Sequence, residues 1–311
     1  MNTPKTVPPQ KKAGLLVTLF MVCAGALPAS ADPYSDAVLA DNPLVYFRFS
    51  ETSGTSVANA GSVPLTGMAS VGTVLVGAPG PGPSNGYEGF TNNTSATIAK
   101  GTNIAIGTTS PSALDPSLKT ALNGASGITV GLWFNASALT SSGGQALFQI
   151  PIAGTSSGQT LSISSTGALV AGGRATSTNS FGSATFAPTL TADTWYNVVT
   201  VFNYASQTIS LYLNGTQVGS QQTISAWAGS NTFTFGSSPG YLSLGSLDTN
   251  FGQSFGGSLD EVAIYNSALS STDIAAQYAA AVPEPSSMAL TGAGLSCIFG
   301  FMLRRKRYLA A

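Results

Sequence analysis

Apolar and polar residues alternate along much of residues 32–281, with the period of two that is typical of half-buried strands. The clearest predicted strands are 44–49, 128–134, 195–202 and 208–213. Weaker strands are predicted at 73–76, 146–150, 161–164, 168–171, 216–219, 232–235, 241–244 and 257–265. Asn214-Gly215 directly follows the segment 208–213, and this pair is a strong signal for a tight turn between two strands.

The same pattern predicts only two helices. A short one is expected at 35–40, and a second begins after Ser270, because Asp273 stands three residues on, as in a capping box. Many short strands with few helices predict an all-β fold, a sandwich of two antiparallel sheets.

Charged residues are scarce between the two ends of the chain. Residues 32–281 hold four cations and eleven carboxylates, a net charge of −7. Nucleic acids and anionic lipids are bound by cationic surfaces, so this balance argues against both as partners. We expect the membrane to be contacted only by the terminal segments.

Residues 32–281 lack histidine and cysteine, two residue types on which much enzyme chemistry depends. The chain has no histidine, and its two cysteines, Cys23 and Cys297, stand outside residues 32–281. Serine–histidine triads and thiolate or histidine metal sites are therefore excluded there. We expect no cofactor; a metal could use only oxygen ligands, as calcium does. Weak calcium candidates are Asp248 with Asn250, and Glu88 with Asn92 and Asn93.

Asp260 and Glu261 form the most enzyme-like pair. Glycoside hydrolysis needs two carboxyls that face each other across a cleft. Neighbours on a strand point to opposite faces, so we expect this pair to tie the last strand to nearby loops instead. Arg48 is expected to form a salt bridge with Glu51 or Asp41.

Aromatic residues suggest where a sugar could stack. Four fall in or beside predicted loops: Trp227, Tyr241, Tyr204 and Phe181. Trp227 and Tyr241 are the candidate ligand platform, although a loop aromatic can equally cover the edge of the sandwich. Trp133 and Trp195 lie in predicted strands and are expected in the core.

The N-terminal 31 residues read as a secretory signal peptide. Three lysines precede an apolar stretch at 13–27, and Ala29-Ser30-Ala31 is a small-x-small cleavage site. Asp32 is then the first mature residue.

The C-terminal segment 282–311 has three parts. The motif Val282-Pro283-Glu284-Pro285-Ser286-Ser287 precedes the apolar run 288–303, and Arg304-Arg305-Lys306-Arg307 follows it. A 16-residue helix would span roughly 24 Å, a short transmembrane helix, and the basic tail belongs on the cytoplasmic side. This order resembles the PEP-CTERM sorting signal of Gram-negative bacteria. A plain single-span anchor is the alternative.

Landmarks of a second family run through residues 32–281. Residues 34–51 read YSDAVLADNPLVYFRFSE, and 128–134 read ITVGLWF; WYNVV (195–199), LYLNG (211–215) and SLDEVAIYN (258–266) follow. In this order they resemble the laminin-G-like, concanavalin A-type jelly rolls of bacterial surface proteins. The hydrolytic branch of that family carries a Glu-x-Asp-x-x-Glu strand, which this sequence lacks.

The two resemblances imply an exported, surface-sorted adhesion or matrix module without catalytic activity. An exosortase-type enzyme would process the tail through an inner-membrane intermediate. Extracellular polysaccharide or a matrix protein would be the partner at the cell surface. A glucanase-like hydrolase and a purely structural surface protein are the alternatives.

Overall fold

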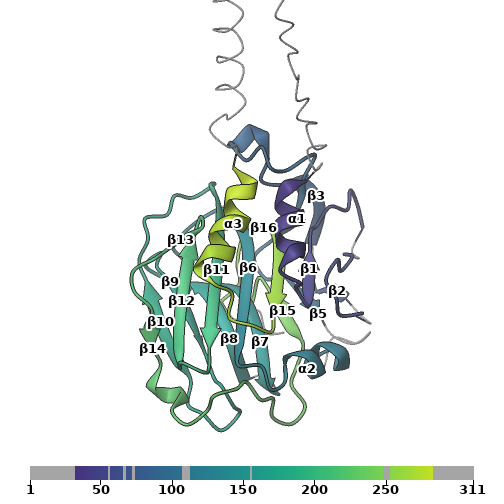
Figure 1. Cartoon of the computed structure of the whole chain (residues 1–311). Helices are drawn as coiled ribbons and strands as arrows, with labels where there is room; N and C mark the ends of the chain where they lie inside the picture. Colours follow the sequence, from purple (N-terminus) through teal and green to yellow (C-terminus); the bar gives the residue numbers. More distant parts are fainter. Residues whose placement is uncertain are drawn as a thin grey trace, which may run out of the picture. The chain divides into compact units, whose positions relative to one another are not determined.

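The structure is a computed structural model that describes residues 32–54, 57–65, 68–71, 74–106, 113–154, 156–247 and 253–282. All of these belong to one compact unit, 31–311. Two antiparallel sheets lie against each other and confirm the predicted all-β sandwich (Figure 1).

The first sheet has nine strands within the described residues, in the order β13-β12-β11-β6-β16-β4-β3, with β1 paired to β16 and β14 to β12. Its strands are β1 (Val45–Phe47), β3 (Val74–Pro79), β4 (Thr94–Ile98), β6 (Gly127–Ala136), β11 (Trp195–Asn203), β12 (Thr208–Leu213), β13 (Thr216–Gln217), β14 (Gln222–Thr223) and β16 (Gly257–Tyr265). The final strand, β16, therefore lies inside this sheet rather than at an edge.

The second sheet has seven strands among the described residues, in the order β10-β9-β8-β7-β15-β5-β2. They are β2 (Met68–Val71), β5 (Asn103–Ile106), β7 (Gln145–Ala153), β8 (Ser156–Ile163), β9 (Leu169–Gly173), β10 (Gly182–Phe186) and β15 (Leu242–Leu244). The helices are α1 (Pro33–Ala40), α2 (Pro116–Leu122) and α3 (Ser271–Ala281), with short 3₁₀ turns η1 (Pro83–Asn85) and η2 (Ser225–Trp227).

Helix α2 is a third helix where only two were expected. Asp115 caps its N-terminus, since the carboxylate accepts hydrogen bonds from the backbone N–H groups of Ser117 (2.9 Å) and Leu118 (3.3 Å). Leu118 and Leu122 lie one turn apart and are both buried. At residues 232–235, conversely, the structure has an isolated bridge between Thr176 and Thr234 and not the predicted strand.

The main core fills the space between the sheets. Along β6, alternate residues Ile128, Val130, Leu132 and Phe134 point into it, as the period of two predicts. We call this the inner core. Strand bounds at β12 and β16 agree with the prediction.

A second apolar layer lies on the outer face of the nine-stranded sheet, under α1 and α3. This outer cluster consists of Tyr34, Val38, Tyr46, Phe90, Trp133, Trp195, Ala263, Tyr265 and Ala281. The Trp133 ring contacts those of Tyr34, Phe90 and Tyr278, at centroid distances of 5.7, 5.4 and 6.0 Å. Both Trp133 and Trp195 are thus buried, as expected, but outside the inner core.

Helices α1 and α3 lie side by side across the nine-stranded sheet (Figure 1). One face of the sandwich is therefore closed by the first and last helices of the described chain. Neither helix lies on the outer face of the seven-stranded sheet; we call this the open face, and along β10 its residues Ser183 and Thr185 are exposed.

Replacing Ser270 with alanine is expected to lower the free energy of unfolding by about 1 kcal/mol. The Ser270 hydroxyl accepts a hydrogen bond from the Asp273 N–H (3.2 Å), and the Asp273 carboxylate accepts one from the Ser270 N–H (3.3 Å), which confirms the predicted capping box. Urea unfolding measures the change. Ser271→Ala is the control, since Ser271 takes no part in the box; equal stability of both variants would contradict the assignment.

In the part of the chain that the structure describes, no helix is both long and apolar enough to cross a bilayer. The predicted signal peptide 1–31 and the predicted membrane helix 288–303 lie outside the described residues.

Candidate functional site

Asp260 and Glu261 share the outer face of the nine-stranded sheet, which corrects the prediction that they point to opposite faces. The register between β16 and β6 shifts after Asp260, and Glu261 has a left-handed φ of 50°. Such a β-bulge interrupts the period of two. Leu259 and Val262, which flank the pair, both belong to the inner core, whereas Asp260 pairs across the sheet with Trp133 of the outer cluster.

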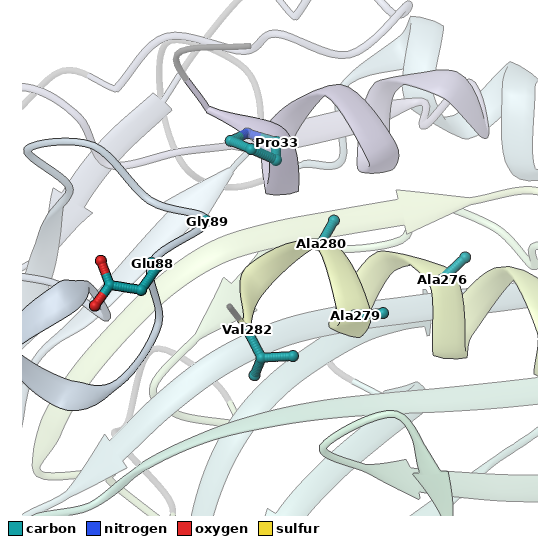
Figure 2. A pocket seen from close by; sticks show the side chains of 7 residues that line it. All are labelled: Pro33, Glu88, Gly89, Ala276, Ala279, Ala280 and Val282. Carbon is teal, nitrogen blue, oxygen red and sulfur yellow. The ribbon is translucent and has the colours of Figure 1, made fainter. Parts of the chain in front are cut away.

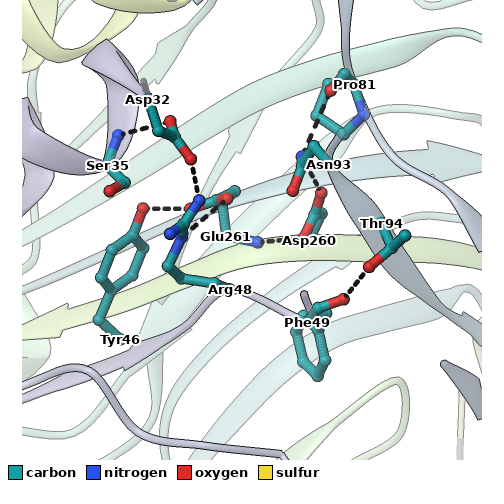
Figure 3. Close-up of polar contacts among 10 residues, drawn as sticks. All are labelled: Asp32, Ser35, Tyr46, Arg48, Phe49, Pro81, Asn93, Thr94, Asp260 and Glu261. Atoms are coloured by element: carbon teal, nitrogen blue, oxygen red, sulfur yellow. Dashed lines mark hydrogen bonds and ion pairs between the residues drawn. The ribbon is translucent and has the colours of Figure 1, made fainter. Parts of the chain in front are cut away.

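Glu261 is held by Tyr46 and Arg48 (Figure 3). Its Oε2 accepts a hydrogen bond from the Tyr46 hydroxyl, and its Oε1 lies 3.7 Å from the Arg48 Nε. The Arg48 Nη2 also pairs with the Asp32 carboxylate, which caps α1 by accepting a hydrogen bond from the Ser35 N–H (3.2 Å). One guanidinium thus connects the first helix, the segment after β1 and the last strand.

The expected partners of Arg48 are wrong. The Glu51 carboxylate accepts a hydrogen bond from the Ala58 N–H (2.7 Å), and the Asp41 carboxylate accepts one from the Gln277 side chain (2.7 Å). Glu51 therefore binds a nearby loop and Asp41 binds α3, and neither pairs with Arg48.

Asp260 joins the last strand to the loop that follows β3 (Figure 3). The Asn93 side-chain amide donates to its Oδ2 (2.6 Å) and to the Pro81 carbonyl (3.3 Å). A Cβ added at Gly80 would lie 2.6 Å from the same Oδ2, so the backbone approaches the carboxylate closely only because residue 80 is glycine. These bonds confirm the predicted structural role, to tie the last strand to neighbouring loops.

Burial governs the acidity of this pair. Both Asp260 and Glu261 are 0% exposed. Desolvation raises the pKa of Glu261 from 4.5 to about 7, although the hydrogen bond from Tyr46 and the charge of Arg48 oppose the shift. Desolvation, and next the adjacent Glu261, raise the pKa of Asp260 well above its ordinary value. A substrate cannot reach either carboxyl in this arrangement.

The calcium candidates are not brought together. Glu88 lines a pocket between α1 and α3, while Asn93 is engaged with Asp260. Asp248 and Asn250 lie outside the described residues. Within the described ranges, no group of three or more Asp, Glu, His or Cys side chains is placed to hold a metal ion.

The pocket beside Glu88 has a volume of about 490 Å³ and marks where the two ends of the domain meet (Figure 2). Pro33, at the start of α1, and Val282, just after α3, both line it. Val282 is the first residue of the predicted sorting motif. The motif residues Pro283, Glu284 and Pro285, the basic tail 304–307 and the cleavage residues Ala29 and Ala31 lie outside the described residues.

A groove of about 430 Å³ lies on the open face of the seven-stranded sheet. The described residues that line it are Ser157, Thr160, Ser162, Val170, Arg174, Phe181, Ser183, Leu247 and Gln253. They come from β8, β9, β10 and the loops beside these strands, except for Leu247 and Gln253, which lie between β15 and β16. Five of these described lining residues carry a hydroxyl or an amide group, three are apolar, Arg174 is the one cation among them, and none carries a carboxyl.

The predicted aromatic platform is corrected by burial. Trp227 is 0% exposed, and its indole N–H donates to the Gly173 carbonyl (2.9 Å) beneath the sheet edge. Tyr241 is 8% exposed, and its hydroxyl accepts a hydrogen bond from Asn103 (3.4 Å). Tyr204 is buried as well. Of the four loop aromatics, Phe181 is 40% exposed and lines the groove.

Sequence reasoning missed Arg174 altogether. It follows β9 directly, and its Cζ lies 5.3 Å from the centroid of the Phe181 ring, a cation–π contact. One feature of the sequence could have pointed to Arg174: cations are rare in residues 32–281, which contain only four.

Comparison with known protein families and structures gives two matches in sequence. Residues 107–275 match the concanavalin A-like lectin/glucanases superfamily, and residues 281–307 match the PEP-CTERM protein-sorting motif. The motif indicates an exported protein that an exosortase sorts to the cell envelope. Comparison with curated proteins gave no significant match.

Similar solved structures include binding domains of botulinum neurotoxins. The receptor-binding domain of mosaic serotype C/D is 14% identical with a TM-score of 0.54, covering 77% of this chain and 51% of that chain. The serotype D ligand-binding domain in complex with N-acetylneuraminic acid is 16% identical with a TM-score of 0.52, covering 78% and 52%. The chain thus spans about half the length of these structures, and the similarity shows the fold alone.

The superfamily match covers more than half of the 311 residues and includes the strands that form the groove. The chain therefore belongs to the concanavalin A-like lectin/glucanases superfamily and carries a PEP-CTERM protein-sorting motif at residues 281–307.

Proposed function

We propose that this protein is an exported, non-catalytic binding module that holds extracellular polysaccharide at the cell surface. The groove on the open sheet face carries the proposal. Its volume of about 430 Å³ falls within the usual range of small-ligand sites, roughly 300 to 1,000 Å³. Its polar surface can exchange hydrogen bonds with sugar hydroxyls, and Phe181 offers an apolar surface beside them.

Two further observations favour binding over catalysis. The carboxyl pair that could serve a hydrolase is buried under the opposite face, where Asn93, Tyr46 and Arg48 hold it. None of the described residues that line the groove carries a carboxyl group. In addition, structural neighbours are described as binding N-acetylneuraminic acid or two ganglioside molecules, which is consistent with a carbohydrate partner.

The sorting motif supports the proposed location. After export, the segment 288–303 would hold the precursor in the inner membrane while the processing enzyme acts at 282–287. The released domain would then remain at the cell surface or in the surrounding matrix.

Phe181→Ala is expected to weaken polysaccharide binding by about three- to tenfold: a pair of aromatic rings contributes about 0.5 to 1.5 kcal/mol, and a sugar stacked on the ring should contribute a similar amount. A panel of polysaccharides, presented to the purified full chain with and without calcium, first identifies one that binds; titration then gives the affinities. Leu75→Ala is the matched control, since Leu75 is an exposed apolar residue (61%) on β3, outside the groove.

Absence of binding to every polysaccharide, or equal losses in the two variants, would contradict the proposal. The same samples test for catalysis through the release of reducing ends. Turnover of a β-glucan that disappears in Asp260→Asn or Glu261→Gln would establish a hydrolase instead.

A further inference from the structure

The floor of the groove is a regular array of small side chains. In cross-strand register, Ser183 of β10 lies opposite Gly172 of β9, and Gly172 lies opposite Thr160 of β8. Two residues along each strand, Ser162 lies opposite Val170. Such short side chains leave the sheet surface low beside the Phe181 ring, so a ligand can lie over the strands next to the ring.

The Phe181 ring lies over Gly172, which leaves room for it because it has no side chain. A Cβ added at Gly172 would lie 2.7 Å from two ring carbons of Phe181. Any larger residue at position 172 would push the ring away from the sheet. The glycine thereby fixes the ring position, and the ring in turn supports Arg174.

Arg174 is held in place on three sides. Its backbone N–H donates to the Gly158 carbonyl (2.7 Å), and its Nη1 donates to the Ser157 carbonyl (2.7 Å). Its guanidinium carbon lies 5.3 Å from the Phe181 ring centroid. A guanidinium has five N–H donors, so one bond to Ser157 leaves further donors for a ligand in the groove.

The charge of Arg174 has no counterpart among the described residues. Both ion pairs found there use Arg48, which lies between Asp32 at the start of α1 and Glu261 of the far sheet. The domain has eleven carboxylates for its four cations, yet none of the described ones pairs with Arg174. A fixed, half-buried guanidinium among hydroxyls is the arrangement that recognises a planar carboxylate through two parallel hydrogen bonds.

We infer that the groove binds an acidic polysaccharide whose sugars carry carboxylates, with Arg174 as the residue that recognises the carboxylate. This inference rests on the proposed function and narrows its ligand class. Neutral sugars would use the hydroxyls of the floor and Phe181 but would leave the guanidinium without an anionic partner. The net negative charge of the domain does not prevent binding, because charges more than about 8 Å apart are largely screened at physiological salt.

Titration of the purified full chain at physiological salt tests the inference. The probes are polygalacturonate for carboxylate, dextran sulfate for sulfate and dextran for a neutral chain. We expect polygalacturonate to bind at least about tenfold more tightly than dextran or dextran sulfate. Arg174→Gln should abolish that preference and weaken polygalacturonate binding about ten- to a hundredfold, because a charge-assisted pair is lost.

Two variants serve as controls. Arg174→Lys keeps the charge without the planar fork, so its affinity should fall between those of the native protein and Arg174→Gln. Lys100→Gln removes an exposed cation that donates to Ser141 (3.1 Å) away from the groove, and should leave binding unchanged. Thermal unfolding confirms that each variant is folded.

The outcomes separate this inference from the proposed function. If no polysaccharide binds, both fail. If dextran binds as tightly as polygalacturonate and Phe181→Ala weakens it, the proposed function stands and the acidic ligand is excluded. Tighter binding of dextran sulfate, or unchanged polygalacturonate affinity in Arg174→Gln, would also overturn the role of Arg174.

Discussion

Lowering the pH from about 8 to about 5 is expected to raise the free energy of unfolding by about 2 to 3 kcal/mol. Burial raises the pKa of Glu261 from 4.5 to about 7, and also raises that of Asp260. The folded protein therefore binds more protons than the unfolded chain between these values. This contribution to stability is complete below pH 4.5 and is lost as the pH rises through about 7.

Urea unfolding at several pH values measures this dependence. Glu261→Gln is the informative control, since the amide keeps the size of the side chain but does not titrate. Its stability should change less with pH than that of the native protein, and the double variant with Asp260→Asn should change least. If the free energy of unfolding of the native protein stays constant or rises between about pH 5 and pH 8, burial does not raise the pKa values of Asp260 and Glu261.

Replacing Pro283-Glu284-Pro285 with three alanines is expected to stop processing and to trap the full-length protein in the inner membrane. Proline favours an extended backbone in the residue before it, and a protease cleft accepts an extended backbone. Alanines would allow a helix predicted for the following apolar run to continue upstream and hide the cleavage segment. Fractionation and mass spectrometry of the membrane and surface pools measure the effect.

The matched control replaces the adjacent Ser286 and Ser287 with alanine, and processing should continue. Deletion of residues 304–307 should have a different effect, since loss of the cytoplasmic basic cluster weakens retention and lets uncleaved chain escape outward. Surface protein that still ends in residues 308–311 would exclude processing and favour an ordinary anchor.

The prediction from sequence succeeded where local patterns decide the structure. Strand β12 was bounded correctly because its alternation is unbroken, β16 was bounded correctly in spite of its bulge, and α3 was found through its capping box. Short strands such as β4 and β10 were missed, since their Ser, Thr and Gly residues carry little apolar signal. Their pairing partners, distant in sequence, determine them.

The candidate site was harder to predict because it depends on contacts between distant segments. The bulge at Glu261 places two consecutive carboxyls on one face, and no local pattern reveals it. Trp227 is buried because η2 folds its ring toward the Gly173 carbonyl. The position of Arg174 beside a groove follows from the pairing of β8, β9 and β10, which the local sequence does not reveal.

The position of β16 has a consequence for the timing of folding. This strand pairs with β6, β4 and β1, so residues 257–265 complete the middle of the nine-stranded sheet. The sheet cannot close before they have been synthesised and exported. Pairing of β1 with a strand more than 200 residues later also makes closure a slow, non-local step. The sorting motif begins fewer than 20 residues after the end of β16, so the domain can complete this sheet only when nearly all of the chain up to the motif has been made.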